Sequence, residues 1–333
     1  MHRQLSIAFQ SDKTPQQYIA LAQLVNQYDF DGVSVYCDAP YHPSFGPLLL
    51  MAPHIERARL GPAAVSPFRI HPIDMAAETA LLAQIAQGRV YLGIARGAWL
   101  HDHGITEPAR PIQAIREAIE IVRYFLSGKS GGYKGEVYRL AEHVTAPYPL
   151  PRNPIPMMIG TWGATLSALA GEIADEVKIG GSSNPAIIPT IQRHITTGEQ
   201  KVGRPIGTVG IVMGAVTVVD EDREQARHVA RRAAALYLPV TIPLDPTIQI
   251  EPDLIERLRN YANQHEFEAA TRLISDDLLD RFAFAGNVAD IVRQCEALFA
   301  AGAQRIEFGT PHGLKPENGI RLLGERVLPA LLG

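Results

Sequence analysis

The sequence predicts an α/β protein, a (β/α)8 TIM barrel with insertions after strands four and seven, on three observations. Short, mostly apolar β-branched runs alternate with longer segments of helical spacing, which is typical of a parallel sheet covered on both faces. Eight such units can be counted, the number that closes a barrel. The 333 residues, 46% of them hydrophobic and 20% charged, are ample for one large core. A doubly wound sheet is the alternative, but it leaves no ready place for eight units and a further C-terminal helix.

The first four units have clear boundaries. Thr14-Pro15-Gln16-Gln17 reads as a capping box with proline at the first helical position, so a helix follows the first strand. The apolar runs predict strands at 5–9, 33–36, 59–65 and 89–95, and the helical spacing predicts helices at 47–57, 73–87 and 112–126.

The second half repeats this plan. Asn287 is a good N-cap, and the apolar residues after it recur at core spacing. The predicted strands cover 156–160, 177–180, 208–219 and 304–309, and the predicted helices cover 164–173, 185–201, 221–237 and 318–331.

Two stretches interrupt the repeat within what we expect to be a single barrel domain spanning 1–333. Residues 128–153 are rich in Gly, Pro and Tyr and form an excursion between units four and five. Residues 237–286 contain four prolines and two expected helices, at 252–265 and 266–274. A long insertion beside a barrel mouth is more often a lid or substrate wall than a linker.

Composition limits the partners and the compartment. Lys and Arg number 31 against 35 Asp and Glu, a formal charge of −4 that argues against nucleic acid as a partner. The two cysteines cannot build a disulfide framework, and we expect Cys295 to be buried in a helix. Without a signal-like apolar segment at the N-terminus or a run long enough to span a bilayer, we expect a soluble, cytoplasmic protein with no membrane partner.

Barrel enzymes hold their chemistry at the carboxyl ends of the strands. Polar and glycine-rich residues gather there in this sequence, and Gly160-Thr161-Trp162-Gly163 precedes a helix. Glycines let backbone N–H groups approach a phosphate, and a helix N-terminus favours negative charge. Phosphate binding and ordinary turn chemistry both explain this stretch.

Histidines offer a competing interpretation. His101-Asp102-His103 is a pattern found in metal-dependent barrel hydrolases, but here it follows the fourth predicted strand instead of the first. We therefore interpret it as a polar rim and predict no metal site. The sequence contains no G-x-G-x-x-G or P-loop motif.

Several stretches resemble the bacterial-luciferase-like flavin and deazaflavin oxidoreductases, and the resemblance covers nearly the whole chain. It rests on residues 65–72, 88–97 and 170–175. The most similar branch is that of the methylenetetrahydromethanopterin reductases, which use coenzyme F420, on the strength of Cys37-Asp38 and residues 180–185, 308–313 and 325–329. The resemblance implies a (β/α)8 barrel, a homodimer or higher homo-oligomer, and bound coenzyme F420, with FMN as the alternative.

The resemblance also implies roles for individual positions. Asp38 matches an aspartate near the deazaflavin ring, and Ala63, Ala64 and Val65 match a bulge behind the ring that often has a cis non-prolyl peptide. We accordingly expect a cis bond between Ala63 and Ala64. The remaining cofactor-binding candidates match the loop after strand four and the phosphate-holding segment after strand five: Arg96, Gly97, His101, Thr161, Trp162 and Gly163.

Three departures from the family pattern leave the expected cofactor unchanged but put the expected substrate in doubt. The reductases carry a glutamate where this chain has Ala8 and a histidine where it has Ala39, and the sugar-phosphate dehydrogenase branch carries a glutamate proton donor at Ala98. The identity of the substrate therefore does not transfer.

The acid–base candidates left near the barrel mouth are Asp38, Tyr41, His42 and His101. Asp38 and His42 are our catalytic candidates. Histidine titrates near neutral pH, so His42→Ala is expected to lower turnover by about 10²-fold, unless His42 is simply a solvated loop residue.

The sequence thus predicts an F420-dependent oxidoreductase that transfers a hydride between the deazaflavin and an unidentified small organic substrate. An FMN-dependent luciferase-like monooxygenase is the alternative within the family. Outside it stand a metal-dependent barrel hydrolase and a catalytically silent cofactor-binding protein.

Overall fold

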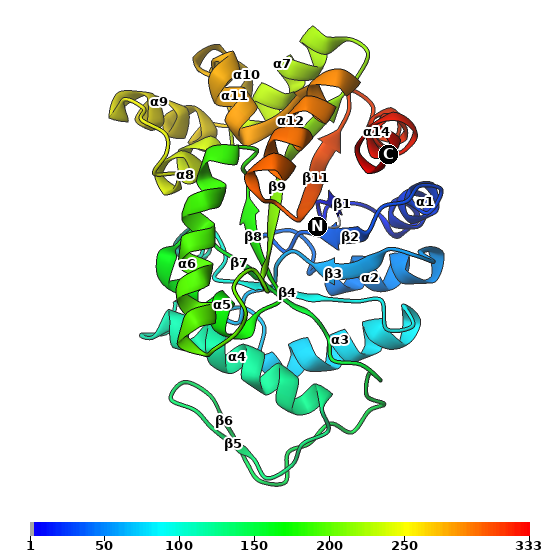
Figure 1. The fold of residues 1–333 in the computed structure, drawn as a ribbon, viewed down its shortest axis with the longest axis vertical. Helices are drawn as coiled ribbons and strands as arrows, with labels where there is room; N and C mark the ends of the chain where they lie inside the picture. The colour runs from blue at the N-terminus through cyan, green and yellow to red at the C-terminus, as the bar shows by residue number, and fades with distance from the viewer. Residues whose placement is uncertain (1–2) are drawn as a thin grey trace.

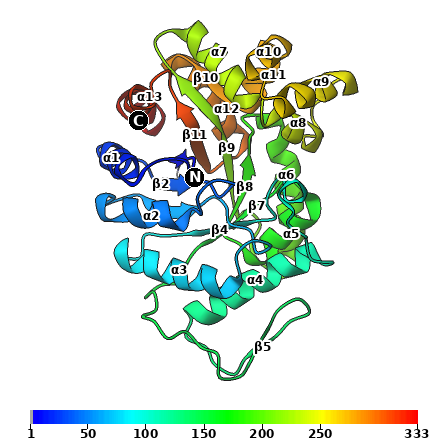
Figure 2. The same cartoon turned by 180° about the vertical axis from the view of Figure 1, so that it is seen from behind.

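Eight parallel strands close into a barrel surrounded by helices in the computed structural model, which describes residues 3–333 (Figures 1 and 2). The strands follow one another around the barrel in the order β3-β2-β1-β11-β9-β8-β7-β4, and bridges from Leu60 to Val90 and from Val65 to Ile94 join β3 to β4. The predicted (β/α)8 barrel is confirmed. The barrel strands are β1 (Gln4–Phe9), β2 (Gly32–Val35), β3 (Arg59–Pro62), β4 (Leu92–Ala95), β7 (Met157–Gly160), β8 (Glu176–Gly180), β9 (Gly210–Val219) and β11 (Arg305–His312).

The helices that cover the barrel begin where the sequence places caps. Thr14 and Asn287 both form the reciprocal hydrogen bonds of a capping box, which confirms the two predicted helix starts. The helices outside the insertions are α1 (Pro15–Val25), α2 (Phe45–Met51), α3 (Pro72–Ile85), α4 (Pro111–Leu126), α5 (Ala164–Ile173), α6 (Ile188–Lys201), α7 (Arg223–Ala234), α12 (Val288–Ala301), α13 (Pro316–Leu322) and α14 (Leu328–Leu332).

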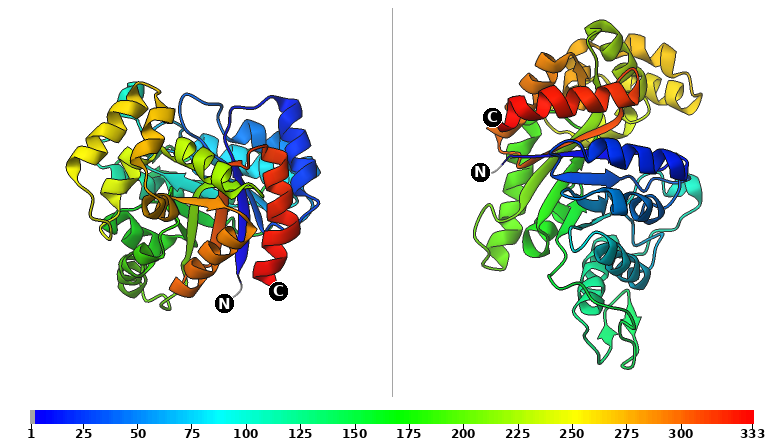
Figure 3. Two further views of the ribbon diagram at one scale, coloured as in Figure 1. Left: turned by 90° about the horizontal axis from the view of Figure 1, so that it is seen from above. Right: turned by 90° about the vertical axis from the view of Figure 1, so that its right-hand side faces the viewer.

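The C-terminal helix differs from its prediction. The expected helix at 318–331 is divided by a π-helical turn, Leu323–Val327, between α13 and α14. Figures 1 and 3 show this segment beside α1, so the two ends of the chain close the same side of the barrel. Cys295 is fully buried on α12 as predicted, and burial raises the pKa of its thiol.

The excursion after α4 contains two short antiparallel strands, β5 (Tyr133–Lys134) and β6 (Arg139–Leu140), and lies outside α3 and α4 (Figure 3). Buried Glu117 of α4 holds its tip, because the carboxylate accepts the backbone N–H groups of Glu136, Val137 and Tyr138 at 2.7, 2.9 and 2.8 Å. This charge-assisted set explains why a segment rich in glycine keeps a defined path.

The insertion after α7 has its own small apolar core, centred on Leu238, Leu258 and Phe282. Its helices stand together at one end of the molecule in Figures 1 and 2. They are α8 (Leu238–Thr241), α9 (Pro252–Asn263), α10 (Phe267–Ala270) and α11 (Asp276–Phe282).

The last four residues of the predicted insertion are a strand that the sequence did not suggest. This strand, β10 (Ala283–Gly286), pairs in parallel with residues 216–219 of β9, beyond residues 210–214, which pair with β8. Four residues are too few to show a period, which is why Ala-Phe-Ala-Gly gave no signal. Among residues 3–333, none of the helices has both the length and the apolar character needed to cross a membrane.

Candidate active site at the carboxyl ends of the strands

A column of charged and polar side chains fills the barrel interior beneath its mouth. At the amino ends of the strands, Arg305 donates to Glu176 at 2.5 Å, and Arg59 donates to the same carboxylate at 3.1 Å. One layer above, Lys178 pairs with Glu307, and both side chains are almost completely buried. The inward positions of these strands therefore hold ion pairs where most barrels hold aliphatic layers.

Two further donors contact the Glu307 carboxylate. Ser34 donates to it at 2.5 Å, and the Arg305 guanidinium lies at 3.5 Å. Burial alone would raise the pKa of Glu307, but the attraction of Lys178 and Arg305 together with these hydrogen bonds holds it below its usual range. Glu307 is therefore an ionised carboxylate at neutral pH.

Inward-facing glycines make room for this column. A Cβ on Gly214 would lie 3.1 Å from Cε of Lys178, and one on Gly309 would lie 2.5 Å from the Tyr36 hydroxyl. Tyr36 continues the column toward the mouth, with Lys178 Nζ 5.1 Å from its ring centroid. Burial raises the pKa of Tyr36 well above its usual value, so it is a neutral phenol.

Asp38 and Tyr237 meet above Tyr36, at the mouth. Asp38 follows β2, whereas Tyr237 comes from the junction between α7 and α8, and the Gln10 side chain lies near enough to both to lower their pKa values. Burial raises the pKa of Asp38, while the Gln10 hydrogen bond and the charges of Lys178 and Arg69 oppose that rise. Burial and the nearby Asp38 charge raise the pKa of Tyr237, which leaves it a neutral hydrogen-bond donor.

Small residues line the strand ends beside this pair. A Cβ on Gly160 would lie 3.2 Å from the Cβ of Ala95 and 4.0 Å from that of Ala64, so the ends of β3, β4 and β7 converge. The Ala63–Ala64 peptide is cis, as predicted. Ala63, Ala64 and Ala95 are partly exposed, whereas Val65 is fully buried beneath them.

The segment after β7 presents free backbone donors. Gly163 is the N-cap of the ten-residue helix α5 and is exposed, so the first N–H groups of that helix face outward. Thr161 Oγ1 accepts the Gly163 N–H at 3.0 Å, and the Trp162 indole donates to the Gly180 carbonyl at 3.1 Å. These bonds fix the turn while leaving the helix N-terminus open to an anion.

The loop after β4 places its candidates at the rim. The Arg96 guanidinium makes a bidentate pair with Glu107 at 2.5 and 2.9 Å. The backbone carbonyl of Arg96 accepts a hydrogen bond from the Ser66 hydroxyl at 2.6 Å. Gly97 has a φ of +97°, a left-handed conformation that glycine adopts readily. His101 lies in a one-turn 3-10 helix with its side chain fully exposed, as a polar rim predicts.

The histidines occupy separate environments. His42 lies in the exposed loop after β2, fixed through its backbone N–H to the Ser11 carbonyl at 3.0 Å. His312 is buried at the end of β11, where Nε2 lies 3.1 Å from the Ala8 carbonyl and burial lowers its pKa to about 4. Within residues 3–333, His, Cys, Asp and Glu side chains form no group of three or more that could hold a metal ion.

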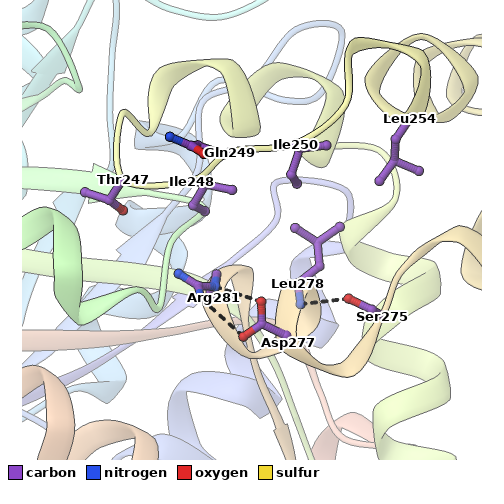
Figure 4. A pocket seen from close by; sticks show the side chains of 9 residues that line it. All are labelled: Thr247, Ile248, Gln249, Ile250, Leu254, Ser275, Asp277, Leu278 and Arg281. Carbon is purple, nitrogen blue, oxygen red and sulfur yellow. Dashed lines mark hydrogen bonds and ion pairs between the residues drawn. The ribbon is translucent and has the colours of Figure 1, made fainter.

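A cavity of about 210 Å³ lies within the insertion and shares no lining residue with the barrel mouth (Figure 4). Arg281 and Asp277, one turn apart on α11, form an ion pair at 3.1 Å in its wall. The neighbouring loop after β8 is bound to the insertion, because Ser183 donates to the Asp280 carbonyl and Asn184 donates to Asp245. This stretch, which the sequence linked to the deazaflavin branch, therefore joins the insertion to the barrel.

Asp38, Ala63, Ala64, Thr161 and Trp162 thus all follow the carboxyl ends of barrel strands and are partly buried, whereas His42 and His101 are exposed at the rim. Sequence reasoning did not select Gln10 or Tyr237 for the site, nor the Lys178–Glu307 pair. Strand alternation could have found Gln10, Lys178 and Glu307, because each occupies an inward position. Tyr237 had no such signal, since it begins an insertion whose path depends on tertiary contacts.

Comparison with known proteins gives a consistent result. A family model described as luciferase-like monooxygenase matches residues 3–305. The chain is 28% identical to the 5,10-methylenetetrahydromethanopterin reductase of Archaeoglobus fulgidus, over 85% of this chain and 86% of that protein. It is 26% identical to an F420-dependent glucose-6-phosphate dehydrogenase of Nakamurella multipartita, over 95% and 93% of the two chains.

Among solved structures, the coenzyme F420 dependent tetrahydromethanopterin reductase of Methanopyrus kandleri superposes with a TM-score of 0.90. The match covers 99% of this chain and 100% of that one at 23% identity. At that identity the superposition shows a shared fold.

Proposed function

Because the chain belongs to the luciferase-like monooxygenase family, whose model matches residues 3–305, we propose that it is an F420-dependent oxidoreductase acting on a small organic substrate. Two of its relatives with different substrates, a methylenetetrahydromethanopterin reductase and a glucose-6-phosphate dehydrogenase, support a common hydride-transfer chemistry. The substrate itself differs between these relatives, so neither is assigned to this chain.

The barrel mouth fits such a coenzyme in two respects. The small side chains of Ala63, Ala64 and Ala95 leave a surface on which a planar ring can lie. The open N-terminus of α5 offers backbone donors and a positive dipole end to a phosphate. This open helix end beside a floor of small residues is the observation that carries the proposal.

The division of labour follows from this arrangement. The bound deazaflavin supplies a carrier for two electrons as a hydride. The chain orients the reactants and supplies protons, and Asp38 is its half-buried acid–base group at the ring position. We further propose that Arg96, Gly97 and His101 form the outer wall of the coenzyme site, and that the insertion forms its lid.

Substitution of Gly163 by aspartate should weaken coenzyme F420 binding by about 1–3 kcal/mol, or roughly 5- to 150-fold in Kd. The new carboxylate would cap the first N–H groups of α5 and repel a phosphate. The backbone at Gly163 (φ −82°, ψ 142°) suits any residue, and a Cβ there meets only Thr161 Oγ1 at 3.8 Å. Titration of the purified variant with coenzyme F420 measures the effect.

Gly163→Ala is the matched control, because it adds the Cβ without a charge or a capping oxygen. We expect its affinity to stay within about threefold of wild type, and the aspartate variant to unfold at the same temperature or higher. Normal coenzyme binding by a folded Gly163→Asp protein would place the phosphate elsewhere, with Gly180 to Ser183 as the next candidate, where the space beside Gly180 is open.

A further inference from the structure

The loop after β8 is polar in sequence and almost completely buried in the structure. It belongs to the glycine- and serine-rich stretch, residues 180–185, that the resemblance linked to the deazaflavin branch. Ser182, Ser183 and Asn184 are at most 2% exposed. Buried polar side chains need hydrogen-bond partners, so those partners indicate what the loop holds in place.

Ser183 joins the loop to α11 of the insertion. Its N–H donates to the Arg281 carbonyl at 2.9 Å, and its hydroxyl donates to the Asp280 carbonyl at 3.0 Å. Helix α8 of the insertion packs on the same loop, because a Cβ on Gly181 would lie 2.9 Å from Cγ2 of Thr241. Two helices of the insertion therefore rest on the loop.

Asn184 joins the loop to the segment between α8 and α9. Its amide donates to the Asp245 carboxylate at 2.8 Å and to the Thr247 hydroxyl at 2.9 Å. Asp245 is 2% exposed and also accepts the N–H and the hydroxyl of Thr247, at 2.9 and 2.6 Å. The side-chain oxygen of Asn184 accepts the Ala186 N–H at 3.1 Å, which fixes the direction of the amide. A buried carboxylate thus depends on Asn184 for a donor, and loss of such a donor costs more than loss of an exposed hydrogen bond.

The start of the same stretch holds the turn that precedes α5. The Gly180 carbonyl accepts the Trp162 indole N–H at 3.1 Å, and the space beside Gly180 is open. Trp162 lies between Thr161 and Gly163, which shape the N-terminus of α5. Its ring packs against the apolar cores of both the barrel and the insertion. The turn is therefore held by residues 180–184 and by the insertion together.

We propose that residues 180–184 couple the insertion to the coenzyme site. In the docked form, with the bonds of Ser183 and Asn184 made, the insertion holds this stretch and the stretch holds the turn at Trp162. Coenzyme binding in return stabilises the docked form. This inference rests on the proposed function, which puts the phosphate at that turn. Ser183, Asn184 and Asp245 act through other groups and are positioning residues.

Coupling of this kind is reciprocal. If the coenzyme binds the docked form more tightly than the undocked form, undocking weakens coenzyme binding by the same factor by which the coenzyme opposes undocking. The insertion can undock as a unit, because it has a small apolar core of its own, centred on Leu238, Leu258 and Phe282. Undocking is then measurable as faster amide hydrogen exchange in the insertion.

The first test measures hydrogen exchange in the wild-type protein with and without coenzyme F420. The reporter is α9, at the outer end of the insertion, and the internal control is the hairpin of β5 and β6 at the other end of the molecule (Figure 1). Coenzyme at about 100 times its Kd should slow exchange in α9 by at least about tenfold, with complete coupling giving about 100-fold. The hairpin should be unaffected.

The second test uses Asn184→Asp, which keeps the shape of the side chain and its capping oxygen but places a second carboxylate against Asp245. Because the two carboxylates repel, exchange in α9 and the Kd for coenzyme F420 should both rise by at least about tenfold. Asn184→Asp combined with Asp245→Asn exchanges donor and acceptor, so both values should return to within about threefold of wild type. Rescue through Asp245 separates coupling from a direct effect of Asn184 on the coenzyme.

Ser183→Ala makes a milder change with less risk to folding, because it removes only the hydroxyl bond to the Asp280 carbonyl. It should raise the Kd for coenzyme F420 by about threefold. The matched control is Asp253→Asn, which removes an exposed ion pair with Arg257 on α9. The control should leave the Kd within about twofold of wild type.

The outcomes separate this inference from the proposed function. Failure of the wild-type protein to bind coenzyme F420 would contradict the proposed function and this inference with it. Normal coenzyme binding that leaves exchange in α9 unchanged would overturn the coupling alone. An unchanged Kd in Asn184→Asp, or in Ser183→Ala if the first variant does not fold, would also overturn the coupling alone.

Discussion

Replacing Lys178 by methionine should lower the free energy of unfolding by about 3–5 kcal/mol, because it leaves a buried carboxylate without its main partner. Methionine matches the length of the lysine stem, so the change removes a charge and creates little empty space. Glu307 is fully buried, and only Ser34 and the more distant Arg305 would remain on it. Urea unfolding of both proteins at neutral pH measures the difference.

The pH dependence of this difference has a definite sign. In the wild type the pKa of Glu307 is lowered, so its stabilisation is present above the ordinary glutamate pKa and is lost as pH falls through the lowered value. In Lys178→Met, burial should instead raise the pKa of Glu307. The variant is then destabilised above that pKa, where the buried carboxylate is charged and has lost its main partner, and it regains stability as pH falls and the carboxylate is protonated. The difference in the free energy of unfolding between the wild type and Lys178→Met should therefore become smaller at acidic pH.

Lys201→Met is the matched control, because Lys201 pairs with Glu172 at 2.8 Å but keeps 65% of its side chain exposed. It should cost no more than about 1 kcal/mol. Lys178→Met combined with Glu307→Gln should recover a large part of the loss. A Lys178→Met protein within about 1 kcal/mol of wild type would show that the pair does not stabilise the barrel.

Reduction of methylenetetrahydromethanopterin should be slower by about 10²-fold or more in this protein than in the Archaeoglobus fulgidus reductase, despite their 28% identity. The reason is chemical: a methyl group at Ala8 and Ala39 can neither donate a proton nor polarise an acceptor. The assay compares the two enzymes at equal saturation with reduced coenzyme F420. Coenzyme binding should be intact, which serves as the control, and turnover comparable to that of the reductase would contradict the prediction.

The barrel was predictable because its determinants are local. Each of the eight barrel strands is a short apolar run with a helical segment near it, and the caps at Thr14 and Asn287 mark helix starts without any tertiary information. The strand that was missed, β10, forms where β9 continues beyond the end of β8 and has an edge free to pair. That pairing is a tertiary property.

The candidate site was predictable in part. Residues next to strand ends, such as Asp38, Ala64 and Trp162, were found because topology alone brings the carboxyl ends of parallel strands together. The Lys178–Glu307 pair was not found, because Lys178 lies on β8 and Glu307 on β11, two strands that are far apart in the sequence. Their charges meet only because both strands pair with β9. Tyr237 depended on the fold of an insertion, and an isolated charge or phenol in a sequence gives no sign of burial.

Parallel titration of the purified protein with coenzyme F420 and with FMN tests the central claim most directly. Both ligands carry a planar ring and a phosphate, so the comparison asks which of the two this mouth prefers. We expect micromolar or tighter binding of coenzyme F420 and at least about tenfold weaker binding of FMN, a difference of about 1.4 kcal/mol. Micromolar affinity for FMN with no detectable binding of coenzyme F420 would contradict the account.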